Sequence, residues 1–201
     1  CTPAEAVEEM VRFSGVDAES VKPREKMAAT IDCKRYMRKK STEKPSKATI
    51  LPDSFMERYS VNPEKLSVWE AEGISKEALK KFQVRYDEFS DRLVYPIRNL
   101  SGQIVNIGGR TLDPEWKRKE LRKYCYFYSW GTMDTIYGLA ENMDSILEKK
   151  EIILFEGCKS VLIASSWGVH NTGALLTSHL NSNQMKILAR LGCRVVFALD
   201  K

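Results

Sequence analysis

The sequence predicts an α+β segment followed by an α/β segment with a parallel sheet, and three observations lead to this prediction. Short helical patterns fill residues 53 to 84. Two strand-like runs then flank a turn at residues 99 to 102. After residue 151, apolar strand-like runs alternate with helical patterns, which is typical of parallel β-α-β units. We therefore expect an antiparallel sheet first and a parallel sheet second.

The N-terminal part predicts one short helix and a basic linker. Thr2 to Glu5 form a capping box with proline at the first helical position, and the helical pattern ends at Gly15. Residues 22 to 47 hold ten Lys or Arg against three acids, with few large apolar residues. This composition fits either a flexible tether beside a polyanion or a solvated linker without a partner.

The middle of the chain predicts a small helical cluster and a hairpin. The helical patterns break at Asn62-Pro63 and at Gly73, and Ser75 is placed to cap the third helix. The runs 92–98 and 103–107 then predict antiparallel strands that end at a glycine pair. A curved antiparallel sheet is the expected product.

The C-terminal third predicts a parallel sheet. A helix over 139–149 precedes it, and the acids and lysines of this helix predict a mostly solvent-facing element at a domain boundary. The expected order is strand 152–155, helix 159–167, strand 171–176, helix 182–191 and strand 194–199.

Composition narrows the class of protein. The 201 residues are 43% hydrophobic with a net charge of +5, and they contain no run of eighteen apolar residues. The N-terminal residues are acidic, unlike a signal peptide. The five cysteines show no CxxC spacing, so we expect free thiols in a cytoplasmic protein and no membrane partner.

Two predicted strands each end in an acid. Glu156 follows the run 152–155, and Asp200 follows the run ending at Leu199. Ligands of open α/β sheets bind outside the carboxyl ends of the strands, so these carboxylates are candidates for holding one divalent cation and its phosphates. The alternative is that they are helix caps or loop residues.

Basic residues form two further candidate sites. Arg92, Arg98 and Arg110 flank the hairpin, and arginine forks suit phosphate oxygens. The glycine pair Gly108-Gly109 would let another backbone approach closely; the alternative is a hairpin with exposed arginines and a bulge.

The stretch 117–128 runs from basic into aromatic residues, including Lys123 and Tyr124. Such a combination suits single-stranded nucleic acid, with cations along the backbone and rings stacked on bases. The alternative is a charged loop leading into a buried strand, on which Tyr124, Tyr126 and Tyr128 face one side. His170, His179 and Cys158 lack positioned partners and predict no catalytic site.

Several of these segments resemble bacterial DnaG-type primases and their phage relatives. The most specific is Arg92 to Arg110, RLVYPIRNLSGQIVNIGGR, and the other matching signals are Glu72–Phe82, Lys123-Tyr124 and Ile136–Leu139. The part after Glu151 resembles the start of a Toprim domain, with Glu156-Gly157 as its Glu-Gly motif and Asp200 opening its Asp-x-Asp motif. Cys158-Lys159-Ser160 departs from the bacterial pattern, which indicates a phage or divergent member.

The resemblance implies a domain plan and a function. The plan is a helix and basic linker over 1–49 after a missing zinc ribbon, a primase subdomain over 50–138, and a truncated Toprim sheet over 139–201. The implied activity is RNA primer synthesis on single-stranded DNA from ribonucleoside triphosphates, with a replicative helicase as partner. The implied cation is Mg2+ or Mn2+, held by Glu156 and Asp200, while Zn2+ belongs only to the ribbon outside this chain.

The resemblance implies that Arg92, Arg110 and Lys123 contact template or nucleotide phosphates. Arg98 belongs to the same set of candidate nucleic-acid contacts, and Tyr124 either stacks on nucleic acid or packs within the protein. Because the metal site is cut by the chain end, we expect the isolated fragment to be inactive. The competing hypotheses are a non-catalytic module that binds single-stranded DNA or a replication partner, and a Toprim nuclease or topoisomerase.

Overall fold

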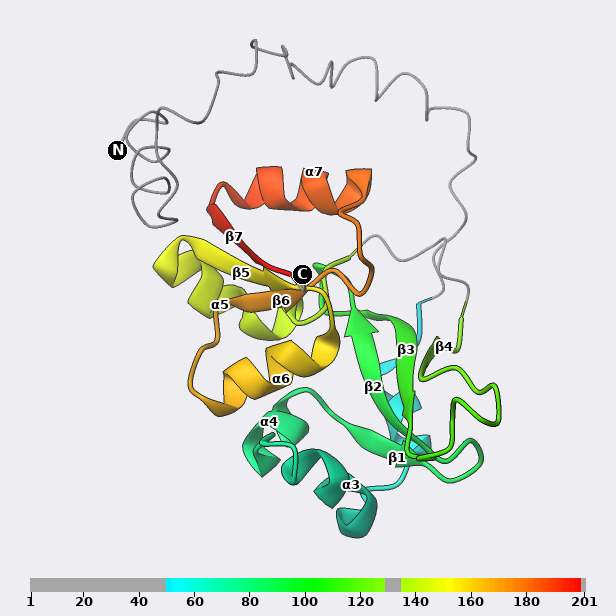
Figure 1. Cartoon of the computed structure of the whole chain (residues 1–201). Helices are drawn as coiled ribbons and strands as arrows, with labels where there is room; N and C mark the ends of the chain where they lie inside the picture. The colour runs from blue at the N-terminus through cyan, green and yellow to red at the C-terminus, as the bar shows by residue number, and fades with distance from the viewer. Residues whose placement is uncertain (1–49, 129–134, 200–201) are drawn as a thin grey trace, which may run out of the picture. The chain divides into compact units, whose positions relative to one another are not determined.

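The computed structural model describes residues 50–128 and 135–199, which contain two sheets with helices around them (Figure 1). The predicted N-terminal helix and basic linker lie outside these residues, as does Asp200. The elements are η2 (Asp53–Arg58), α3 (Pro63–Glu70), α4 (Lys76–Lys81), β1 (Arg85–Asp87), β2 (Arg92–Arg98), β3 (Ile104–Thr111), β4 (Tyr124–Tyr126), α5 (Leu139–Lys149), β5 (Glu151–Phe155), α6 (Cys158–Ser166), β6 (Thr172–Ala174), α7 (Ser182–Leu191) and β7 (Arg194–Ala198). The elements predicted between residues 53 and 199 occur in the expected order, and β1 is an additional strand that was not predicted.

Local sequence signals explain the helix starts. Asn62 caps α3 by accepting from the amide of Lys65, with a proline next in the chain. Ser75 caps α4 in the same way. At α7, Asn181 and Gln184 form a reciprocal capping box.

The first sheet is antiparallel in the order β1-β2-β3-β4, and the second is parallel in the order β6-β5-β7. Both sheet types were predicted. The β2–β3 register shifts between Ile97 and Arg98, so Arg98 pairs with Ile104. This irregularity changes the alternation of side chains at the end of β2.

Helices cover both faces of the parallel sheet. Ile152 and Leu154 of β5 pack in one cluster with residues of α5 and α7. Phe155 instead packs against the cluster that contains residues of α6. Figure 1 shows α7 and α6 on opposite sides of the sheet.

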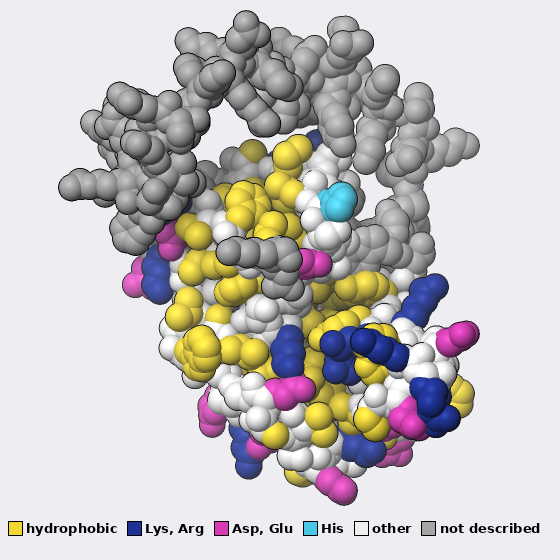
Figure 2. Space-filling view, viewed as in Figure 1, with side chains coloured by type: hydrophobic (Ala, Val, Ile, Leu, Met, Phe, Trp, Pro, Cys, Tyr) yellow, Lys and Arg dark blue, Asp and Glu magenta, His cyan; other side chains and the backbone are white. Residues whose placement is uncertain are grey.

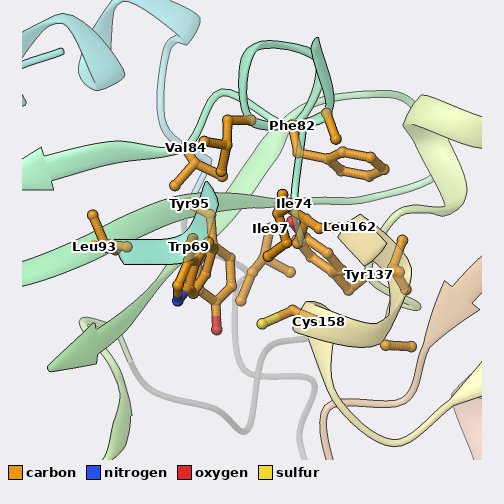
Figure 3. Packing of buried hydrophobic residues seen from close by; sticks show 14 of the residues in the cluster. Trp69, Ile74, Phe82, Val84, Leu93, Tyr95, Ile97, Tyr137, Cys158 and Leu162 are labelled. Carbon is orange, nitrogen blue, oxygen red and sulfur yellow. The ribbon is translucent and has the colours of Figure 1, made fainter. Parts of the chain in front are cut away.

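The largest core cluster spans the predicted boundary at residue 139. Trp69, Phe82 and Tyr95 come from the antiparallel part, and Tyr137 and Cys158 come from the chain that leads into the parallel sheet and α6 (Figure 3). Phe82 stacks on Tyr137 with ring centroids 5.8 Å apart. The two predicted subdomains therefore share apolar packing, although the boundary itself stays a prediction.

The helix α5 is more buried than its charges predicted. Asn142 is 2% exposed, and the Glu141 side chain is 10% exposed. The prediction of a mostly solvent-facing helix is therefore wrong for its first turn, because polar partners from other elements replace water there. Within the described residues, no helix combines the length and apolar character that crossing a membrane requires.

Candidate functional site

The carboxyl ends of β5 and β7 lie at one edge of the parallel sheet. The register pairs Phe155 with Ala198, so the chain leaves both strands at the same level. Glu156 follows β5 with a half-buried side chain, and Leu199 follows β7. The second predicted acid, Asp200, lies outside the described residues. Adjacent parallel strands therefore bring Glu156 and the chain after β7 to the same edge.

Two hydrogen bonds connect this edge to the antiparallel sheet. The amide of Leu176 donates to the carbonyl oxygen of Glu156 at 2.9 Å. The hydroxyl of Tyr126, on β4, donates to the carbonyl oxygen of Leu176 at 3.3 Å. The strand that carries the predicted aromatic residues thus lies next to the predicted metal edge.

Arg110 and Tyr124 form a cross-strand pair beside this junction. They are directly opposite each other in the β3–β4 register, and the Arg110 guanidinium lies 5.4 Å from the centre of the Tyr124 ring. Burial raises the pKa of Tyr124. Tyr124 packs against the largest core cluster, which favours the interpretation as a buried strand.

The third predicted tyrosine does not continue this face. β4 ends at Tyr126, and Tyr128 packs against a different cluster beside Phe55. Asn106 explains the change, because its side chain bonds both the amide and the carbonyl group of Tyr128. The prediction that the three tyrosines face one side is therefore wrong at Tyr128.

Arg92 lies on the opposite face of the sheet from Arg110. The register places Leu93, not Arg92, opposite Arg110. A Cβ atom at Gly109 would lie 3.3 Å from both the Arg92 Cδ and the Cys125 Sγ, so these groups share the second face. Arg92 Nη1 also donates to the carbonyl oxygen of Arg122 at 3.0 Å. The two predicted phosphate contacts are not brought together.

Arg98 is held inside the protein by four groups. Its side chain is 13% exposed, with Nη1 2.7 Å from Asp53 Oδ1 and 2.5 Å from the carbonyl oxygen of Gly102. Nη2 donates to Gln83 Oε1 at 2.6 Å. Nε lies 3.6 Å from Glu141 Oε1. These partners occupy the guanidinium edge that a phosphate would need, so we assign Arg98 a structural role.

Glu141 is a buried acid that the sequence analysis did not single out. Burial raises its pKa, although the nearby charges of Arg98 and Lys81 act against this. Its Oε2 atom is buried without a hydrogen-bond partner among the described residues. Its place in the first turn of a predicted helix gave no signal of burial, since acids there usually face water.

The glycine pair is packed by side chains, not by a second backbone. A Cβ atom at Gly108 would lie only 2.3 Å from the Tyr95 ring. At Gly109 the nearest atoms belong to the side chains of Phe127, Arg92 and Cys125. The expectation that this pair admits an approaching backbone is therefore wrong for the described residues.

The loop between β3 and β4 gathers cations around Trp116. The ammonium groups of Lys117 and Lys123 lie 5.5 and 5.7 Å from the centre of its ring. Figure 2 shows Lys and Arg side chains beside hydrophobic ones on the face toward the viewer. The basic and aromatic character predicted for this stretch is present, but Trp116, one position before the predicted run, is its centre.

Cys158, His170 and His179 have the following surroundings. Burial raises the pKa of Cys158 to about 12, which keeps its thiol protonated. The Nδ1 atoms of His170 and His179 lie within hydrogen-bond distance of Ser165 and Ser178 respectively. Across residues 50–128 and 135–199, no three His, Cys, Asp or Glu side chains cluster as metal ligands would.

The chain is similar to DNA primases in sequence. Residues 44–126 match the family described as DNA primase catalytic core, N-terminal domain. A DNA primase of Halalkalibacterium halodurans is 33% identical over 116 residues, which are 58% of this chain and 19% of the relative. The SPbeta prophage-derived uncharacterized protein YorJ of Bacillus subtilis is 33% identical over 144 residues, which are 67% of this chain and 38% of the relative. The chain thus spans less than half the length of these relatives.

Solved structures show the same fold. The zinc-binding and RNA polymerase domains of the Aquifex aeolicus primase match with a TM-score of 0.66 at 22% identity, covering 98% of this chain and 53% of that one. A DnaG primase catalytic domain bound to single-stranded DNA matches with a TM-score of 0.62 at 18% identity, covering 72% and 58%.

Proposed function

Residues 44–126 belong to the N-terminal domain family of the DNA primase catalytic core, and from this premise we propose that the chain is part of an enzyme that makes RNA primers on single-stranded DNA. The observation that carries this proposal is the edge at Glu156. There the end of β5 lies in register with the end of β7 and is connected through Leu176 to Tyr126 on β4. Glu156, at the end of β5, is thus connected to β4, the strand on which Tyr124 pairs with Arg110.

The edge of the parallel sheet at the carboxyl ends of β5 and β7, which we call the acid edge, carries Glu156 and suits a hard cation. A divalent ion such as Mg2+ typically binds one or two carboxylates and completes its shell with water and substrate phosphates. Glu156 supplies one carboxylate, and Asp200 is the proposed second. Such an ion would neutralise charge on a triphosphate during nucleotidyl transfer.

The basic residues supply positioning. Arg110 and Lys123 are the proposed phosphate contacts on the side of β4 and its preceding loop, with Tyr124 as packing support for Arg110. Arg92 is a proposed contact only for nucleic acid that passes the other face. Holding template and triphosphate in place lowers the entropic cost of bringing the reacting groups together.

The test is primer synthesis by the full natural protein with Glu156→Gln. With ribonucleoside triphosphates, single-stranded template and Mg2+, we expect templated synthesis to fall roughly 100-fold or more, because the amide cannot replace the carboxylate as a cation ligand. Binding of single-stranded DNA should stay within about twofold, since Glu156 contacts no template in this proposal.

Glu148→Gln is the matched control, because it makes the same chemical change at an exposed position on α5. It should leave synthesis unchanged. Undiminished synthesis in Glu156→Gln would remove Glu156 from the mechanism. A protein that binds DNA but makes no primer even unaltered would support the non-catalytic binding module instead.

A further inference from the structure

A pocket lies between α3, the end of β3 and the loop that follows it. Its cavity is about 120 Å³, several times what one water molecule needs, so it can hold a group the size of a ring. Trp69, Leu112 and Trp116 supply apolar walls, and Arg110 supplies a cation. Glu72, Thr111 and Asp113 add further polar groups to the lining, so the pocket offers both apolar walls and polar partners, as sites for planar ligands do.

The charges around the pocket favour an anionic chain on its rim. Two lysines, Lys117 and Lys123, place ammonium groups within 6 Å of the Trp116 ring centre, at 5.5 and 5.7 Å. Both lysines are exposed, and neither forms an ion pair within the described residues. Their charges are therefore free for an incoming ligand.

The acids that line the pocket are already paired. Lys119 holds Asp113 at 2.6 Å, and this hydrogen bond lowers the pKa of the aspartate. Glu72 forms an ion pair with Lys159. These internal pairs reduce the repulsion that lining carboxylates would exert on a phosphate at the rim.

The loop itself is held in place before any ligand binds. The amide of Leu121 donates to the carbonyl oxygen of Trp116 at 2.8 Å, and the amide of Glu115 donates to the Asp113 carboxylate at 2.8 Å. A backbone that is already ordered loses little conformational entropy when a ligand binds beside it. The loop therefore presents the Trp116 ring together with two nearby ammonium groups.

We propose that Trp116 is a stacking site for one base of single-stranded DNA, with Lys117 and Lys123 contacting the phosphates that flank this base. The proposal rests on the proposed function, which supplies the single-stranded ligand, and it adds a base-binding position outside the acid edge. Stacking on an aromatic ring accepts any base, so the site would hold the strand without reading its sequence.

The test compares wild-type protein with Trp116→Ala on two labelled oligonucleotides of equal length. One is single-stranded DNA of mixed sequence, and the other carries abasic linkers in place of the bases. On the first, we expect Trp116→Ala to raise Kd roughly 5- to 100-fold, and Trp116→Phe to raise it much less. On the abasic oligonucleotide, wild type and Trp116→Ala should bind equally, because no base remains to stack.

Trp167→Ala is the matched control, since this tryptophan is 77% exposed at the end of α6, outside the pocket. It should bind both oligonucleotides as wild type does. Salt dependence separates stacking from charge: Lys123→Ala should reduce the slope of log Kd against log salt by about 0.7, and Trp116→Ala should leave the slope unchanged.

Equal affinity of wild type and Trp116→Ala for the base-containing oligonucleotide would overturn the proposal. An equal loss on both oligonucleotides would also overturn it, because the effect would then not involve a base. Competition by free nucleoside monophosphate, without any effect of Trp116 on the oligonucleotide, would assign the pocket to a free nucleotide and overturn it as a strand contact. Failure of the wild type to bind either oligonucleotide would instead contradict the proposed function.

Discussion

The parallel and antiparallel sheets place their candidate residues in different ways. In the parallel sheet, β5 and β7 run side by side in register, so the chain after each strand reaches the same edge. In the antiparallel sheet, the candidates lie within strands. Arg110 shares a face with Leu93, and Arg92 lies on the other face beside Gly109 and Cys125.

This difference shows when the sequence alone can predict that candidate binding residues lie close together. Strand direction alone brings residues at the ends of parallel neighbours together. Residues inside antiparallel strands are separated by alternation, so an odd or even position decides whether two arginines can meet. Three sets of substitutions in the antiparallel sheet test this contrast.

Arg98→Ala should cost about 3 kcal/mol of unfolding free energy, because it leaves the Glu141 carboxylate buried without its nearest cation. Denaturant titration of the variant measures this cost. The double variant with Glu141→Gln should recover part of the loss, since no buried charge then remains. Arg118→Ala, which breaks only an exposed ion pair with Glu115, should cost less than about 1 kcal/mol. Similar costs for both arginines would contradict the structural role of Arg98.

Gly108→Ala and Gly109→Ala compare the two faces of β3 directly. The new methyl group at 108 meets the enclosed Tyr95 ring, and we expect a loss of roughly 1–3 kcal/mol. At 109 the contacts are 3.2 to 3.3 Å, to the side chains of Phe127, Arg92 and Cys125, and the first two are able to shift. The loss there should be below about 1 kcal/mol. Thermal unfolding of both variants decides the order, and a reversed order would contradict the assigned faces.

Arg110→Ala and Arg92→Ala test which face binds nucleic acid. If the strand follows the side of β4 and the Trp116 loop, Arg110→Ala should reduce the salt slope of single-stranded DNA binding by about 0.7. Arg92→Ala should change it by much less, because its guanidinium lies on the other face. Anisotropy titrations at several salt concentrations measure both slopes. A larger effect of Arg92 would place the binding surface on the second face.

Much of the fold follows from local sequence signals. The caps at Asn62 and Ser75 and the alternation of strands and helices after residue 151 predicted elements that the structure contains. Strand order within each sheet required the three-dimensional structure. Glu156 at a strand end was predictable because its position depends only on where an apolar run stops.

The positions and partners of the basic side chains could be predicted less well from the sequence. Arg98 turns inward because the β2–β3 register shifts beside it, and its partners Asp53, Gln83 and Glu141 come from distant positions in the chain. A local sequence pattern cannot predict contacts between residues that are this far apart in the chain. Trp116 was missed for a different reason, since its significance comes from two lysines and a pocket that only the folded loop creates.

Gly108 also affects how related sequences should be interpreted. The Tyr95 ring lies where the Cβ atom of any other residue at position 108 would be, so selection for stability alone disfavours every other amino acid there. Invariance at this position in an alignment would therefore record steric exclusion, and it would carry no information about phosphate binding. A residue can be irreplaceable in evolution without ever touching the substrate.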